Sequence, residues 1–217
     1  MMMNLFSVFD PSTGVLSLNW LSMILIMMLP QPFWTSHSKI IICIIKVMNK
    51  LCNEVIMHLK KSEPSIILVS MFMMILINNF MGLIPYIFTA SANLTFSMSF
   101  ALTMWLSMMI YGWINKCNSM FTHLVPVGTP VILMPFMVMI ETISNLIRPG
   151  SLAVRLSANM IAGHLLMSLL GNNLSSNVYL MMFMMWLFML LMMFEMAVAF
   201  IQAYVFMTLT TLYSSEI

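Results

Sequence analysis

Residues 140–164 have the sequence IETISNLIRPGSLAVRLSANMIAGH, which places four ionisable side chains inside a long apolar run. A charge in hydrocarbon is costly, so it occurs there only with a partner or a water path. Arg155 is the clearest case, because its neighbours include Val154 and Leu156 and no Asp or Glu lies within a helical turn. We therefore predict that the partner of Arg155 comes from elsewhere in the fold or from another protein.

The composition of the chain is that of an integral membrane protein. Of 217 residues, 62% are hydrophobic and only 6% are charged, and the mean hydropathy is +1.02. Soluble domains carry about 25% charged residues. No basic patch interleaved with aromatic residues is present, so nucleic acid is not an expected partner. Cys43, Cys52 and Cys117 fit no metal-ligand spacing, and we expect neither a metal nor a cofactor.

The N-terminal part predicts one crossing and its orientation. Residues 15–34 are apolar and about long enough to span a bilayer, which takes roughly 20 residues. No Lys or Arg precedes them, whereas five lysines follow. Because positive residues concentrate on the inner side, we expect the N-terminus outside and residues 36–64 inside. Those lysines are Lys39, Lys46, Lys50, Lys60 and Lys61.

Residues 36–64 predict an amphipathic helix rather than a plain loop. Lys39, Lys46, Lys50, Glu54 and Lys61 fall on one helical stripe, and isoleucines and other apolar residues fill the remainder. Such a helix lies in the membrane interface with its lysines toward anionic headgroups. We expect Pro64 to end it.

Two further crossings are expected at residues 66–84 and 94–115, followed by Lys116 on the inside and a connecting loop over residues 117–130. Residues 131–170 and 178–213 then form two much longer apolar segments. At 1.5 Å per residue they would extend about 60 and 54 Å, whereas the bilayer core is about 30 Å thick. Each segment must fold back or tilt steeply. Breaks are expected at Pro135 and Pro149-Gly150, and a turn at 171–177.

We therefore predict one all-α membrane domain over residues 1–217. It is a multi-pass bundle with an interfacial amphipathic helix and two long, steeply tilted C-terminal helices forming a hairpin. No internal repeat and no soluble domain interrupts it.

Helical spacing organises the polar residues of the two long segments. Glu141, Arg148 and Arg155 are seven residues apart and share a stripe, provided that Pro149 does not break the helix. Asn159 lies one turn beyond Arg155 on nearly the same face, and His164 points to the opposite side.

In the last segment, Glu195 and Gln202 are again seven residues apart and share a face. One interpretation is a static buried ion pair between Arg155 and Glu195. That interpretation explains less well why so many small residues surround the arginine, since small residues allow another helix to approach closely. They are Gly150, Ser151, Ala153, Ser157, Ala158, Ala162 and Gly163.

Four segments resemble subunit a of the proton-translocating ATP synthase, in its mitochondrial type. The core motif is RLSANMIAGH at residues 155–164. The others are HLVPVGTP at 123–130, IQAYVF at 201–206 and NNFMGLIP at 78–85. The resemblance spans nearly the whole chain, although the N-terminal third matches more by layout than by residues.

The resemblance implies that Arg155 is the essential arginine, facing the carboxylates of a rotating ring of subunit c between two offset half-channels. Glu141, Asn159 and Gln202 would line the proton path. His164 and Glu195 stand where bacterial relatives carry a Glu and a His, so the order in which they handle the proton stays open. Arg148 either belongs to the same proton path or forms only an auxiliary pair with Glu141.

The same resemblance implies a non-catalytic stator subunit whose partners are the ring of subunit c, other membrane and peripheral-stalk subunits, the lipid bilayer and protons as the transported ion. No phosphate-binding loop or nucleophile–base set is present in the sequence. The 31 methionines are typical of a genetic code that reads an isoleucine codon as methionine. They would indicate synthesis inside the organelle, the other account being that Met is a flexible apolar filler. The resemblance implies a mitochondrial inner-membrane location.

Three other functions remain as alternatives. A structural or quinone-site subunit of a respiratory redox complex would need histidines at matching depth, which His123 and His164 do not obviously provide. A secondary transporter would carry inverted repeats and paired broken helices. A purely structural bundle predicts that Arg155 is replaceable.

Overall fold

The computed structural model of the chain describes residues 5–28, 36, 38–125, 130–174 and 178–216. Within these residues the regular structure is helical throughout. Four helices are long and apolar enough to cross a membrane: α2 (Glu63–Gly82), α3 (Leu94–Asn115), α5 (Met134–Leu174) and α6 (Val178–Glu216). The predicted fold class, an all-α membrane bundle with two long C-terminal helices, is confirmed.

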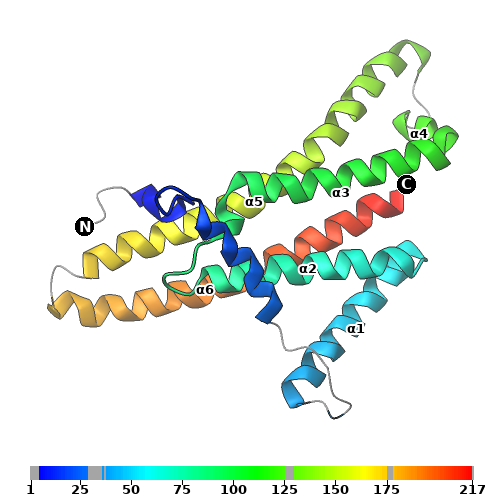
Figure 1. Cartoon of the computed structure of the whole chain (residues 1–217). Helices are drawn as coiled ribbons and strands as arrows, with labels where there is room; N and C mark the ends of the chain where they lie inside the picture. Colours follow the sequence, from blue (N-terminus) through cyan, green and yellow to red (C-terminus); the bar gives the residue numbers. More distant parts are fainter. Residues whose placement is uncertain (1–4, 29–35, 37, 126–129, 175–177, 217) are drawn as a thin grey trace.

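Two 3-10 helices, η1 (Leu5–Phe9) and η2 (Leu18–Met28), precede the bundle. η2 packs against α2, and η1 lies against α5 (Figure 1). The crossing expected at residues 15–34 is described only in its first part, because residues 29–35 lie outside the described residues. It stays a prediction.

Helix α1 (Lys39–Leu59) has one buried side and one exposed side. Ser38 caps its start, and the αL conformation of Lys60 (φ 55°) ends it. Leu51 and Val55, one turn apart, are buried where α1 packs on α2 and α6. The lysines of its polar stripe are exposed, as an amphipathic helix requires; they are Lys39, Lys46 and Lys50.

Pro64 does not end the amphipathic segment, contrary to the expectation. Helix α1 already ends at Leu59, and Pro64 lies in the first turn of α2. A proline is tolerated there because the first N–H groups of a helix have no intrahelical partner.

The packed centre of the bundle joins α2, α5 and α6. Lipid tails are as apolar as leucine, so helices in a membrane associate mainly through close van der Waals packing. Ala153 of α5 and Ala203 of α6 are each 0% exposed, which lets neighbouring backbones approach. The larger side chains of this core are Leu68, Phe72, Ile75, Leu152, Leu156, Phe206 and Met207.

The loop expected at residues 117–130 is partly helical. Helix α4 occupies Cys117–Leu124, and residues 126–129 lie outside the described residues. A kink at Lys116, which has φ −134° and ψ 45°, separates α4 from α3. The turn brings Phe121 edge-on against Trp113, with ring centroids 5.1 Å apart. This contact packs α4 against the end of α3.

Helix α5 is continuous through Pro149, where a break was expected. It also contains Pro135 in its first turn and runs past Gly171 to Leu174, into the expected turn. Proline removes one backbone donor and crowds the preceding turn, but membrane helices tolerate it because neighbouring helices and local adjustments compensate. The two halves of α5 run in different directions in Figure 1.

The helix ends lie in two groups, one at each end of the bundle. Figure 1 places the α1–α2 junction, α4 and the C-terminal end of α6 toward one end of the bundle. η1, the end of α5 and the start of α6 lie toward the other. The first end carries Lys60, Lys61 and Lys116, and the positive-inside rule predicts that it is the inner end.

Candidate functional site

Arg155 lies on the exposed side of α5. Leu152, Ala153 and Leu156 pack into the bundle with at most 5% of their surface exposed, whereas Val154 and Arg155 are exposed. Among the described residues, Arg155 makes no ion pair within 4.0 Å. A static pair between Arg155 and Glu195 is therefore not formed in this structure.

Glu195 is instead buried between α5 and α6, with 8% of its surface exposed. Neither carboxylate oxygen has a hydrogen-bond partner among the described residues. A buried charge without a partner is strongly disfavoured, and an ionisable side chain at such a position inside a span is typically functional.

A cavity of about 370 Å³, here called the α5–α6 pocket, brings together three of the predicted site residues. Asn159 enters it from α5, and Glu195 and Gln202 enter it from α6. The seven-residue spacing on α6 gives Glu195 and Gln202 the same face, as the helical period requires. Apolar side chains form the remaining wall: Met160, Ala162, Leu166, Leu191, Phe194, Val198 and Ile201, together with Gly163.

Gly163 makes room for the carboxylate. A Cβ built on Gly163 would lie 2.6 Å from Oε1 of Glu195 and 2.9 Å from its carboxyl carbon. Real Cβ atoms essentially never make contacts that short, so the carboxyl group could not occupy this place if position 163 carried a side chain.

His164 is next to Gly163 but does not line the α5–α6 pocket. Its ring meets Phe9 of η1 edge-on, with centroids 6.3 Å apart. Its Nε2 atom is buried and has no hydrogen-bond partner among the described residues. The imidazole thus contacts η1 and does not line the pocket that contains the Glu195 carboxyl group.

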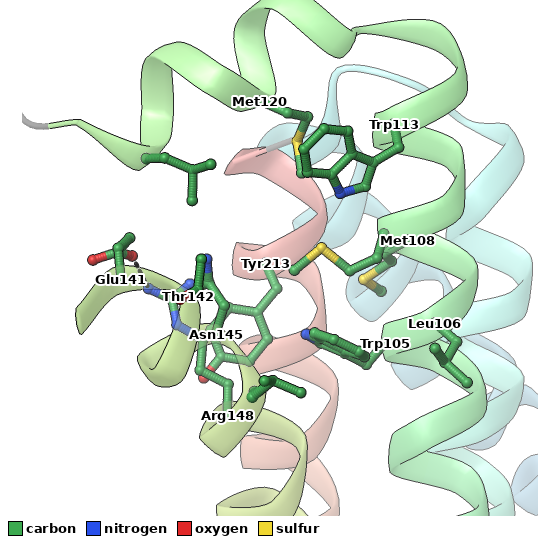
Figure 2. Close-up of a pocket in the computed structure, with 13 residues that line it drawn as sticks. Trp105, Leu106, Met108, Trp113, Met120, Glu141, Thr142, Asn145, Arg148 and Tyr213 are labelled. Carbon is green, nitrogen blue, oxygen red and sulfur yellow. Dashed lines mark ion pairs between the residues drawn. The ribbon is translucent and has the colours of Figure 1, made fainter. Parts of the chain in front are cut away.

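A second cavity, of about 660 Å³, lies between α3, α4, α5 and the end of α6 and is here called the α3–α5 pocket (Figure 2). Glu141 and Arg148 line it from α5, seven residues apart. Arg148 Nη2 lies 3.7 Å from Glu141 Oε1. Both side chains are about one-third exposed, so the pair itself stabilises by about 0–1 kcal/mol.

Tyr213 completes this polar cluster from α6. The guanidinium carbon of Arg148 lies 5.1 Å from the centroid of the Tyr213 ring, within the range of a cation–π contact. Figure 2 shows Arg148 between Glu141 and the tyrosine ring. No pattern in the sequence pointed to Tyr213, because residues 148 and 213 meet only through the packing of two helices.

The two pockets flank Arg155 along α5. The α3–α5 pocket uses residues of α5 up to Arg148, and the α5–α6 pocket uses residues from Asn159 onward. From Arg155, the helical rise is about 10.5 Å back to Arg148 and about 6 Å forward to Asn159. Arg155, which has no ion-pair partner in the described part of the chain, thus lies on α5 between the residues that line two cavities, each of which contains a carboxyl group.

These features define a polytopic, all-α membrane protein with ionisable groups gathered inside its spans. Among the described residues, no group of three His, Cys, Asp or Glu side chains could hold a metal ion. Ionisable side chains within such spans are typical of ion and proton pathways.

Comparison with known proteins identifies the family. A family model described as ATP synthase A chain matches residues 15–215. The chain is 56% identical to ATP synthase subunit a of Locusta migratoria, with both chains covered completely. It is 54% identical to that of Drosophila simulans and 49% identical to that of Anopheles gambiae, again over the full length of each chain.

The chain belongs to the ATP synthase subunit a family, and its role lies in the membrane sector of the proton-translocating ATP synthase. This family assignment favours the predicted function over the redox-complex, transporter and purely structural alternatives.

Proposed function

We propose that the chain is a non-catalytic, proton-conducting stator subunit in which Arg155 faces the carboxylates of the ring of subunit c. The observation that carries this proposal is the placement of Arg155, which is exposed, unpaired among the described residues and situated between two cavities. An exposed guanidinium within a spanning helix needs an anionic partner. A ring carboxylate supplied by a neighbouring subunit would be that partner.

In this proposal the two pockets belong to two half-channels. The α3–α5 pocket is lined by α4 and by Tyr213, near the lysine-rich end, and serves the inner side. The α5–α6 pocket, with Asn159, Glu195 and Gln202, serves the outer side. Glu141 and Glu195 are the carboxyl groups that would relay protons, and His164, next to Gly163, would assist Glu195.

The chemistry follows from the environment of the ring carboxyl group. In lipid, burial favours its neutral form. Within about 4–6 Å of Arg155, the positive charge favours the ionised form, so the group releases its proton. It reloads from the other half-channel after passing. The fixed cation also opposes direct proton hopping between the pockets, and each proton crossing supplies about 2.3 kcal/mol per 100 mV.

The exposed surfaces of the chain suggest its contacts with the ring, the lipid and other subunits. The exposed small residues of α5 near Arg155, Ser151 and Ala158, let a ring helix approach closely. The lysine stripe of α1 faces the anionic headgroups of the inner leaflet. Other membrane and peripheral-stalk subunits cover further apolar faces, and the membrane is the mitochondrial inner membrane.

The test is proton-driven ATP synthesis in the assembled complex with Arg155→Ala and Arg155→Lys. We expect no coupled synthesis with Ala. We expect a strong defect with Lys, which keeps the charge but loses the planar fork of donors. Val154→Ala, an exposed neighbour, is the matched control and should retain synthesis. Normal synthesis in Arg155→Ala would refute the proposal.

A further inference from the structure

Two arginines, Arg148 and Arg155, occupy nearly the same stripe of α5 because seven residues make almost two full turns. They differ in surroundings. Arg155 is exposed and makes no ion pair among the described residues, whereas Arg148 is partly buried in the α3–α5 pocket. Two mobile guanidiniums on one face would compete for the same incoming carboxylate.

Arg148 is restrained from two directions. Glu141, two turns earlier on α5, lies 3.7 Å from its Nη2 atom. Tyr213, near the end of α6, presents its ring 5.1 Å from the guanidinium carbon. One contact is an ion pair and the other is a cation–π contact, and they come from different helices (Figure 2).

We propose that Glu141 and Tyr213 form a clamp that holds Arg148 inside the α3–α5 pocket, so that Arg155 is the guanidinium presented to the ring carboxylates. Tyr213 is then a positioning residue that acts through Arg148. This inference rests on the proposed function of Arg155 and adds a role for the C-terminal end of α6.

The physical reason for the clamp is that Arg148 and Arg155 lie on the same stripe of α5. A released Arg148 would stand about 10.5 Å from Arg155 along the helix, and a long, flexible side chain shortens that separation. A second cation near the path would bind a ring carboxylate at the wrong point of its rotation. Holding Arg148 against an acid and an aromatic ring removes this competition.

The test uses synthesis per assembled complex, so that a loss of assembly is not read as a loss of coupling. Tyr213→Phe keeps the ring face and should retain synthesis. Tyr213→Leu removes it and should lower synthesis about two- to fivefold, the change that corresponds to losing one exposed cation–π contact. Tyr213→Met is a second variant without a ring, for use if Leu assembles poorly.

The decisive variant is the double substitution Tyr213→Leu with Arg148→Gln. If Tyr213 acts by restraining Arg148, removing the released cation restores synthesis toward the normal level. A double variant no better than Tyr213→Leu, or a Phe variant as defective as Leu, would overturn the clamp. Failure of the proposed function would appear separately, as normal synthesis in Arg155→Ala.

Discussion

A Cβ added to Gly163 of α5 would lie 2.6 Å from Oε1 of Glu195 on α6, so a side chain at this point would displace the Glu195 carboxyl group from its present place. The carboxyl group of Glu195 is therefore seated directly against α5, one residue from His164. The position of the acid in the α5–α6 pocket depends on the absence of atoms at position 163.

The substitution Gly163→Ala tests whether this position of the Glu195 carboxyl group matters for proton transfer. The extra methyl group must displace the carboxyl group of Glu195, and the flexible end of that side chain can move without separating the helices. We expect reduced ATP-driven proton pumping in complexes that still assemble. Gly171→Ala on the same helix is the control, because a Cβ there meets nothing within 4 Å. Equal proton pumping in the two variants would argue against a role for this position of the Glu195 carboxyl group.

Glu195→Gln tests whether the buried carboxyl group exchanges protons. The amide has nearly the same shape but cannot take up or release a proton at neutral pH. Because neither oxygen of Glu195 has a partner among the described residues, the substitution breaks no visible hydrogen bond. We expect normal assembly and a large loss of proton conduction, measured as dissipation of an imposed pH gradient in vesicles. Val198→Ala, in the same pocket wall, serves as the control and should conduct normally.

Asn79→Ala tests the attachment of α2 to α6. Asn79 is 0% exposed, and its Nδ2 donates to the backbone carbonyl of Ala199 at 3.4 Å. Removing a typical hydrogen bond costs about 0.5–1.5 kcal/mol, so we expect a lower thermal midpoint for the complex in detergent. Asn115→Ala, on an exposed position of α3, should leave the midpoint unchanged. A similar shift in both variants would contradict this role.

Two contacts compete to explain how α1 is held against the bundle. The hydroxyl group of Tyr204 donates to Glu54 Oε2 at 3.3 Å on an exposed surface, whereas Leu51 is buried. Exposed substitutions usually change stability by less than about 0.5 kcal/mol, while Leu→Ala in a core costs about 2–5 kcal/mol. We expect Leu51→Ala, but not Tyr204→Phe, to increase proteolytic cleavage within α1. The reverse order would assign the attachment to the hydrogen bond.

The helices were predictable where composition alone determines them. Long apolar runs must be helical in a membrane, because every backbone polar group needs an internal partner. The same rule explains why α5 continues through Pro149: the environment favours helix over the local preference of one residue. α4 was not predicted; it packs on α3 and α5, and contacts such as that of Phe121 with Trp113 could not be read from the sequence pattern.

The sequence was enough to predict which residues of α5 and α6 belong to the candidate site. It was not enough to predict which of them contact one another across the two helices. Helical spacing placed Glu195 and Gln202 on one face, and the structure gathers them with Asn159 in one pocket. Spacing could not show that Arg148 would meet Tyr213, or that Gly163 would accommodate Glu195. Both relations arise where two helices cross, and only the packed structure defines that crossing.

The most direct test of the central claim is the position of the Arg155 side chain in a structure of the assembled ATP synthase. We predict that its guanidinium lies toward the ring, within about 4–6 Å of a ring carboxylate at one rotational position. An Arg155 paired with Glu195 or another carboxylate of its own chain would contradict the account, as would an Arg155 turned to bulk water outside the bilayer.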